Sequence, residues 1–203
     1  MEQIELAYQY IATKNIDIVY SLLGKLKVKS PVTFSHSLEV AKFSLAVGQK
    51  VGLSNEDLTN LYTAALLHDI GKLGVEKDIL HGSNLTEEEI DSIRYCHIQK
   101  TFEILKSKNL DEEIINIAYH HHERINGSGY PNHLKGDELS DLDRILQVAD
   151  VTSAISMGRG YQVGLNTEKT EERLNELVTA NLLDNKYVSA MIDVLDENCL
   201  PED

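Results

Sequence analysis

Cysteine and proline are scarce in this sequence, and long apolar runs are missing. Its 203 residues include two cysteines, Cys96 and Cys199, which lie far apart and outside any CxxC spacing. This excludes a disulfide framework and a zinc ribbon as the basis of the fold. No apolar run of about 18 residues occurs, and the N-terminus MEQIELAYQY has neither a basic segment nor a hydrophobic core of the signal-peptide type. We therefore expect a cytoplasmic protein with no membrane partner.

Positive charge is also in the minority. The chain has 19 Lys and Arg residues against 33 Asp and Glu residues, a formal net charge of −14. Because such a surface repels phosphate backbones, a nucleic acid polymer is a poor candidate for a partner. A nucleotide ligand would need a local positive centre, and bound metal cations supply one.

Apolar residues recur at helical spacing along almost the whole chain, and no clear alternating strand is present. The sequence therefore predicts an all-α fold, a helical bundle. Two short helices are expected at 2–12 and 15–28. The second should end before Pro31, because helical geometry is disfavoured at a residue that precedes proline. We interpret residues 1–30 as an N-terminal helical appendage and 31–203 as the main domain.

The C-terminal half contains one long loop and a closing helical pair. Residues 124–141 are rich in Gly and Asn and lack periodicity, which predicts a long loop. Long loops in compact domains often contribute to function. Amphipathic patterns near 167–183 and 185–198 predict two further helices.

Side chains that bind metals interrupt the apolar stripes of the predicted helices. His36 heads the stripe of a helix over 32–51, and the helix predicted over 111–123 places two histidines on its apolar face. Five predicted helices together supply seven such side chains, namely His36, His68, Asp69, His97, His121, His122 and Asp150. A lone histidine on an apolar face is more often a core residue, but a buried carboxylate is rare unless it is paired or binds a metal.

The composition of this set favours two metal ions over one. Imidazole and carboxylate groups suit Fe, Mn, Zn or Co, and the absence of thiolates disfavours a structural zinc site. Seven ligands are too many for one ion, whereas two ions joined by a bridging carboxylate accommodate them. Such pairs are a known device for phosphoester hydrolysis.

Four segments in the same order resemble the HD-GYP branch of the HD superfamily. They are HSLEV at 36–40, HDIGK at 68–72, HHERINGSGYP at 121–131 and ILQVADVTSA at 145–154. The resemblance covers roughly residues 31–165. It implies an HD-superfamily helical bundle and a phosphodiesterase that hydrolyses cyclic di-GMP, or a related cyclic dinucleotide, to pGpG or GMP by attack of a hydroxide that bridges two metals.

The resemblance also implies roles for individual residues. His36, His68, Asp69 and Asp150 match the first metal set, His97, His121 and His122 match the additional ligands, and Asp69 is the expected bridge. Asp69 and Lys72 are the expected catalytic residues. Lys72, Gly129, Tyr130, Pro131 and Arg159 are the expected substrate-binding residues. Val32 occupies the position of a third-metal Glu, so two divalent ions, Fe or Mn, are expected as cofactors.

Two positions depart from the family pattern. Ser153 stands where an Asp is usual, and Gln162 stands where a cation is usual. These departures leave two alternatives open besides the cyclic dinucleotide phosphodiesterase. One is an HD hydrolase that acts on another nucleotide, and the other is a catalytically weak sensor that signals through a partner. The expected protein partner is either a regulatory protein or a second copy of this chain in a homodimer.

Overall fold

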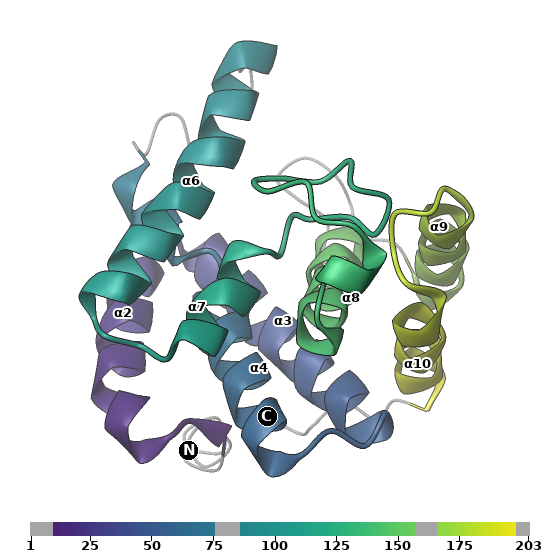
Figure 1. The fold of residues 1–203 in the computed structure, drawn as a ribbon, viewed down its shortest axis with the longest axis horizontal. Coiled ribbons are helices and arrows are strands. Elements are labelled where there is room, and N and C mark those ends of the chain that lie inside the picture. Colours follow the sequence, from purple (N-terminus) through teal and green to yellow (C-terminus); the bar gives the residue numbers. More distant parts are fainter. Residues whose placement is uncertain (1–9, 76–85, 157–165, 198–203) are drawn as a thin grey trace.

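The described residues form an all-helical bundle without strands, as predicted. The structure is a computed structural model that describes residues 10–75, 86–156 and 166–197. Its elements are η1 (Thr13–Asn15), α2 (Ile16–Lys29), α3 (Pro31–Lys50), α4 (Asn55–Leu67), η2 (Ile70–Gly74), α6 (Glu87–Ser107), α7 (Glu112–Tyr119), η3 (Gly136–Glu138), α8 (Asp141–Ser156), α9 (Thr167–Thr179) and α10 (Asn185–Asp196) (Figure 1). None of the helices in these ranges is long and apolar enough to cross a bilayer.

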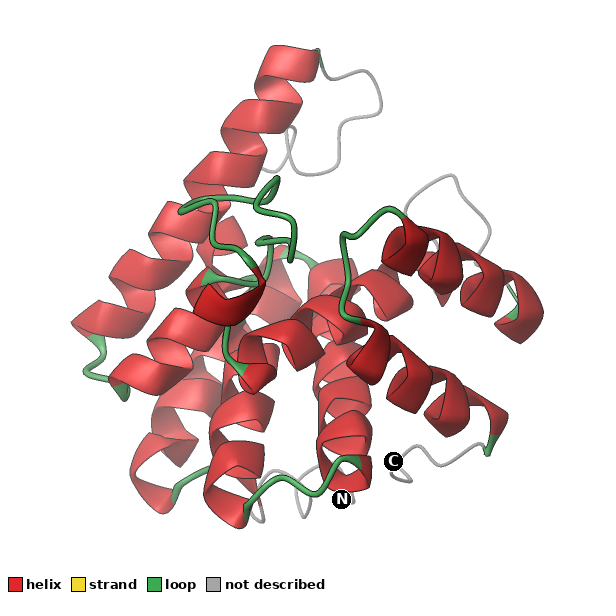
Figure 2. Cartoon of the chain, turned by 45° about the vertical axis from the view of Figure 1, so that its right-hand side comes forward, coloured by secondary structure: helices red, strands yellow, loops and turns green. Residues whose placement is uncertain are grey.

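Helix α3 is the central element of the bundle. Helices α2, α4, α8 and α10 all pack against it. Its residues Val40, Ala41 and Val47 are fully shielded from solvent. Figures 1 and 2 show α9 and α10 as a pair to one side of the bundle, while α6 extends beyond it at the opposite side. A polar side chain on the inner face of α3 is therefore held inside the core.

Helix starts follow the capping chemistry of the sequence. The Ser54 hydroxyl accepts a hydrogen bond from the backbone N–H of Asp57 at 3.1 Å and so caps α4. Ser30 caps α3 in the same way, and Pro31 occupies the first turn, where its missing N–H costs no hydrogen bond.

Helix α2 packs against α3, α4 and η2, and it buries Val19, Leu22 and Leu26 in the same core. A domain boundary at residue 30 remains a prediction, because the described contacts do not test it. Of the first predicted helix, residues 2–9 lie outside the described residues.

Two helices end earlier than their periodicity predicted. The helix predicted over 111–123 ends at Tyr119, and residues 120–122 form a turn. The helix predicted over 167–183 ends at Thr179, because Asn181 adopts a left-handed conformation with φ 55° that closes a C-terminal turn. The predicted loop extends from residue 124 to residue 140, because α8 begins at Asp141, and it contains η3 and one isolated bridge between Asn126 and Lys135.

Candidate metal centre

All seven side chains expected to bind metal meet inside the bundle. They come from α3 (His36), the junction of α4 and η2 (His68, Asp69), α6 (His97), the turn after α7 (His121, His122) and α8 (Asp150). Six are buried and His122 is half-buried. The structure brings them together, and their role as ligands remains a prediction.

The seven side chains contain two compact groups of three. In the first group, His36, His68 and Asp69 each offer one donor atom, and these atoms lie within 4.8 Å of one another. In the second group, His97, His121 and His122 do the same. Two groups of this kind fit two ions, each of which would have nitrogen or oxygen ligands and no thiolate.

The two carboxylates of the set, Asp69 in the first group and Asp150 outside both, each face side chains of both groups. Asp69 faces His68 with Oδ2, at 3.5 Å from Nε2, and faces His97 with Oδ1, at 3.6 Å from Nε2. Asp150 lies 3.0 Å from Nε2 of His36 through Oδ1 and 3.9 Å from Nδ1 of His122 through Oδ2. Each carboxylate therefore has one oxygen for each group, which is the arrangement that a bridging ligand requires.

Backbone carbonyls set the orientation of two imidazoles. Nδ1 of His68 donates to the carbonyl oxygen of Ala65 at 2.7 Å, and Nδ1 of His121 donates to that of Ala118, also at 2.7 Å. The proton on Nδ1 leaves the lone pair of Nε2 directed into the centre. Both Nε2 atoms and Oδ1 of Asp69 are buried without a hydrogen-bond partner among the described residues. Buried polar atoms are rarely left so, and metal cations would satisfy all three.

Gly71 fixes the spacing between the two groups. A Cβ at this position would lie 1.9 Å from the carbonyl oxygen of His97, so the backbone that follows Asp69 packs directly on α6. The Gly71 N–H also donates to Oγ1 of Thr101, whose hydroxyl in turn donates to the carbonyl oxygen of His68. The glycine of HDIGK is therefore a steric requirement of the site.

The pKa values of three predicted ligands are shifted in the direction that metal binding needs. Burial lowers the pKa of His121 well below its ordinary value and that of His122 to about 3. Burial acts to raise the pKa of Asp69, but the Lys72 ammonium and His68 outweigh it and hold this pKa well below its usual range. Neutral imidazole and ionised carboxylate are the forms that ligate a cation.

Lys72 lies at the margin of the centre. Its Nζ is 2.5 Å from Oδ2 of Asp69, and its side chain is 17% exposed whereas that of Asp69 is 2% exposed. The lysine thus spans the distance between a buried carboxylate and the solvent side. Its role in catalysis remains a prediction.

The loop with the sequence GYP lies directly against the second group. The ring of Tyr130 is 4.9 Å from that of His122, measured between centroids. A Cβ on Gly129 would lie 2.3 Å from the backbone nitrogen of Arg124, so only glycine allows the loop to pack this closely. Pro131 follows Tyr130 in the same loop.

Glu123 is a buried residue that was not predicted from the sequence to belong to the site. It is fully shielded from solvent, and its carboxylate accepts hydrogen bonds from the backbone N–H groups of Asn132 at 2.6 Å and Leu134 at 3.0 Å. The Glu of HHE therefore holds the loop against the metal ligands. Its position directly after His122 was the available signal.

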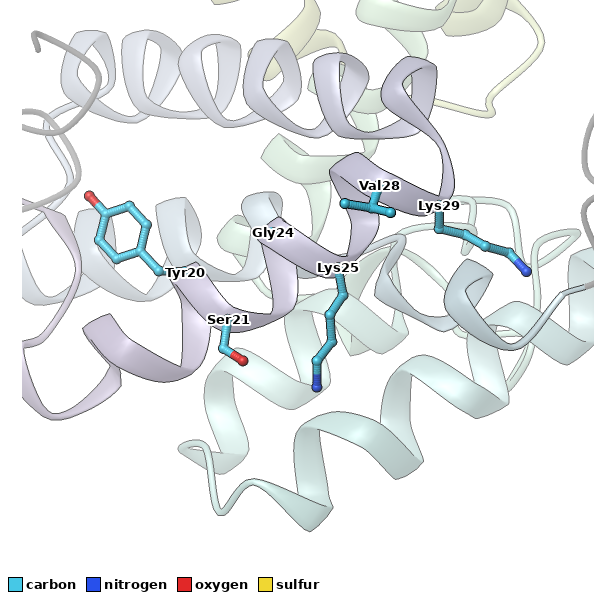
Figure 3. A pocket seen from close by; sticks show the side chains of 6 residues that line it. All are labelled: Tyr20, Ser21, Gly24, Lys25, Val28 and Lys29. Carbon is cyan, nitrogen blue, oxygen red and sulfur yellow. The ribbon is translucent and has the colours of Figure 1, made fainter.

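Three further residues that the sequence analysis discussed, Val32, Arg159 and Gln162, are not part of the cluster of seven side chains in the described structure. Val32 is 65% exposed at the start of α3. Arg159 and Gln162 lie outside the described residues. An apolar surface hollow lies along the outer face of α2, where Tyr20, Gly24 and Val28 contribute to its lining, and it contains none of the predicted site residues (Figure 3).

The fold and the site together define a helical protein built around clusters of His and Asp side chains that are able to hold metal. Residues 19–185 match the HD domain family, and the chain belongs to that family.

Two curated relatives share this part of the sequence. The 3'3'-cGAMP-specific phosphodiesterase 3 of Vibrio cholerae is 33% identical over 190 residues, which cover 93% of this chain and 40% of the relative. The cyclic di-GMP phosphodiesterase PA4108 of Pseudomonas aeruginosa is 32% identical over 155 residues, covering 76% of this chain and 37% of the relative. The chain thus spans about two fifths of the length of each.

Solved structures agree on the fold. The HD domain of the Listeria monocytogenes phosphodiesterase PgpH matches with a TM-score of 0.68 and 21% identity, covering 88% of this chain and 96% of that one. Bd1817, an HDG"Y"P protein from Bdellovibrio bacteriovorus, matches with a TM-score of 0.64 and 22% identity over 79% of this chain and 51% of that one. The resemblance to the HD-GYP branch is confirmed by these relatives and this fold.

Proposed function

We propose that this chain is a metal-dependent phosphodiesterase that hydrolyses a cyclic dinucleotide to its linear product. One observation carries the proposal: two groups of three ligands are joined by Asp69 and Asp150, each with one oxygen toward either group. A single ion would not need both groups. A pair of cations is suited to a phosphate diester, whose charge spreads over several oxygens.

We propose Fe or Mn as the metal, because the donor set is compatible with both and the resemblance to the HD-GYP branch implies them. Five imidazoles and two carboxylates offer nitrogen and oxygen atoms, and the described part of the centre contains no cysteine. When bound, two such ions would polarise the phosphoryl group and lower the pKa of an attacking water. Hydrolysis then breaks the bond between phosphorus and one ribose oxygen, which takes up a proton.

The residues around the ligands act on orientation and charge. Ala65 and Ala118 hold the His68 and His121 rings through their carbonyl oxygens, so the ligands need little reorganisation when a cation binds. Lys72 adds a positive charge beside Asp69, within reach of a non-bridging phosphate oxygen. In a chain of net charge −14, cations and Lys72 would supply the local attraction for an anionic substrate.

The relatives support a cyclic dinucleotide as the substrate class. One is named for 3'3'-cGAMP and another for cyclic di-GMP, and a PgpH HD domain structure is a complex with cyclic-di-AMP. These three ligands differ in their bases and share the cyclic phosphodiester ring. Cyclic di-GMP remains the first substrate that we expect. The proposal also includes a cytoplasmic location and either a regulatory partner protein or a homodimer.

The test is turnover by protein loaded anaerobically with Fe or Mn. Cyclic di-GMP, 3'3'-cGAMP and cyclic-di-AMP would be supplied separately, and linear products would be separated by chromatography. We expect at least one to be hydrolysed, and a chelator to stop the reaction. If the protein holds two ions per chain but turns over none of the three, the proposal is wrong and a metal-containing sensor explains the chain better.

A further inference from the structure

The metal centre has an aromatic extension toward solvent. The Tyr95 ring lies 4.8 Å from the Tyr130 ring, and the Tyr130 ring lies 4.9 Å from the imidazole of His122. The interplanar angles are 42° and 40°. Three rings from α6, the GYP loop and the second group of ligands therefore form a continuous row.

Tyr95 is exposed, so packing in the core does not explain why this position has an aromatic side chain. It is 50% exposed, although it lies two residues before the buried ligand His97 on α6. Among the described residues, the other large exposed apolar side chains are Tyr20, Val28 and Val32, which lie on α2 and the first turn of α3. Tyr95 differs from them because its ring contacts a ring that contacts a metal ligand.

The row also marks the open side of the centre. The side chain of His122 is 19% exposed, while those of His68 and His97 are 1% and 3% exposed. A substrate phosphate that reaches the ligands from solvent would thus pass beside His122 and Tyr130. The nucleoside attached to that phosphate would lie further out, where Tyr95 is.

We propose that Tyr95 and Tyr130 form a stacking site for one nucleobase of the substrate. The inference rests on the proposed function. Tyr130 is already an expected substrate-binding residue, and the new elements are Tyr95 and the nucleobase as the group that the two rings hold. Aromatic rings stack on any base because every base has a π face, so this site would contribute binding without selecting between guanine and adenine. An uncharged aromatic surface also suits a chain whose net charge opposes an anionic ligand.

The first experiment compares Tyr95→Ala and Tyr95→Phe in metal-loaded enzyme, with Tyr20→Ala as the matched control on α2. Stacking on one base is worth enough that Tyr95→Ala should raise KM for the cyclic dinucleotide by roughly tenfold. Tyr95→Phe should keep the wild-type KM because it retains the aromatic ring. The kcat should change little in both variants. An unchanged KM in Tyr95→Ala, with wild-type turnover intact, would overturn the inference and leave the proposed function standing.

The second experiment uses the absence of tryptophan from the chain. Tyr95→Trp gives a protein with a single indole, whose fluorescence a stacked base should quench when cyclic di-GMP or 3'3'-cGAMP is mixed with the metal-loaded protein. Ribose 5-phosphate, which has no base, should leave it unchanged, and so should either dinucleotide added to Tyr20→Trp. Equal quenching at both positions would show that the signal does not come from stacking at Tyr95. Thermal melting of each variant verifies that it is folded.

Discussion

The hydroxyl of Ser153 lies 2.8 Å from Nδ1 of His36. The same hydroxyl donates to Oε2 of Glu39 at 2.5 Å, so the imidazole is joined to a carboxylate through one serine. Burial raises the pKa of Glu39, although the hydrogen bond from Ser153 acts to lower it. Position 153 is where the HD-GYP pattern expects an Asp, and here Glu39 supplies a carboxylate one step further from the ring.

The link between Glu39 and Ser153 predicts an effect on metal affinity. Glu39→Ala removes the acceptor of the Ser153 hydroxyl proton, so the Ser153 oxygen is no longer held as an acceptor for Nδ1–H of His36. Outer-shell partners of this kind are worth about 10–100-fold in metal affinity, and we expect a loss in that range by calorimetric titration. Glu172→Ala, at an exposed position of α9, is the control. Equal affinity in both variants would show that the link does not support the centre.

Asp69→Ala should abolish both turnover and tight metal loading. The carboxylate faces both groups of ligands, and its removal also leaves Lys72 as a positive charge at the margin of the centre. Metal analysis should fall well below two ions per chain. Asp111→Ala, which removes an exposed ion pair with Lys14, should keep both properties. Full turnover in Asp69→Ala would place the active site elsewhere.

Metal should stabilise the folded chain, because it would satisfy Nε2 of His68, Nε2 of His121 and Oδ1 of Asp69, which are buried without a hydrogen-bond partner among the described residues. At a free metal concentration 100 times Kd, the gain is about 2.7 kcal/mol per site. For a domain of this size we expect Tm to rise by roughly 5–10 °C per site. Differential scanning calorimetry with Mn and then with a chelator measures this shift. The Asp69→Ala variant should respond much less, and an equal response would mean that the ions bind elsewhere.

Glu123→Gln should destabilise the fold by about 1–3 kcal/mol. Two backbone N–H groups of the loop donate to this buried carboxylate, and an amide would turn an NH₂ group toward one of them. Urea unfolding of the metal-free protein gives the free energy of unfolding. Glu112→Gln, in the exposed first turn of α7, is the matched control and should change it by a few tenths of a kcal/mol. A similar small change in Glu123→Gln would show that the loop does not depend on this residue.

Local patterns in the sequence were sufficient to predict most of the helices and to select seven side chains that the structure brings together. Capping by Ser54 and the stripe headed by His36 depend on neighbours within a few residues, and both are found in the structure. The same periodicity extended the helix before His121 and His122 too far. A stripe tells which face is buried, but it does not tell where the backbone leaves the helix to direct a ring at a metal.

Contacts between distant segments could not be predicted from periodicity. Ser153 reaches Glu39 across 114 positions, and the packing of Gly71 on α6 depends on a backbone distance that no local pattern encodes. The separation of six predicted ligands into two groups of three, with Asp150 facing both, likewise depends on how the helices cross. Such features require the three-dimensional arrangement because each depends on two elements at once.

The distribution of the ligands along the chain has a consequence for synthesis. His36 leaves the ribosome early, but its partner Asp150 follows 114 residues later, and α8 completes the centre. A chain that stops short of Asp150 has the imidazoles without the second carboxylate, so a cation would be held weakly and lost readily to cellular chelators. If the centre is loaded as proposed, retention of the ions would thus report that α8 is present and has docked on α3.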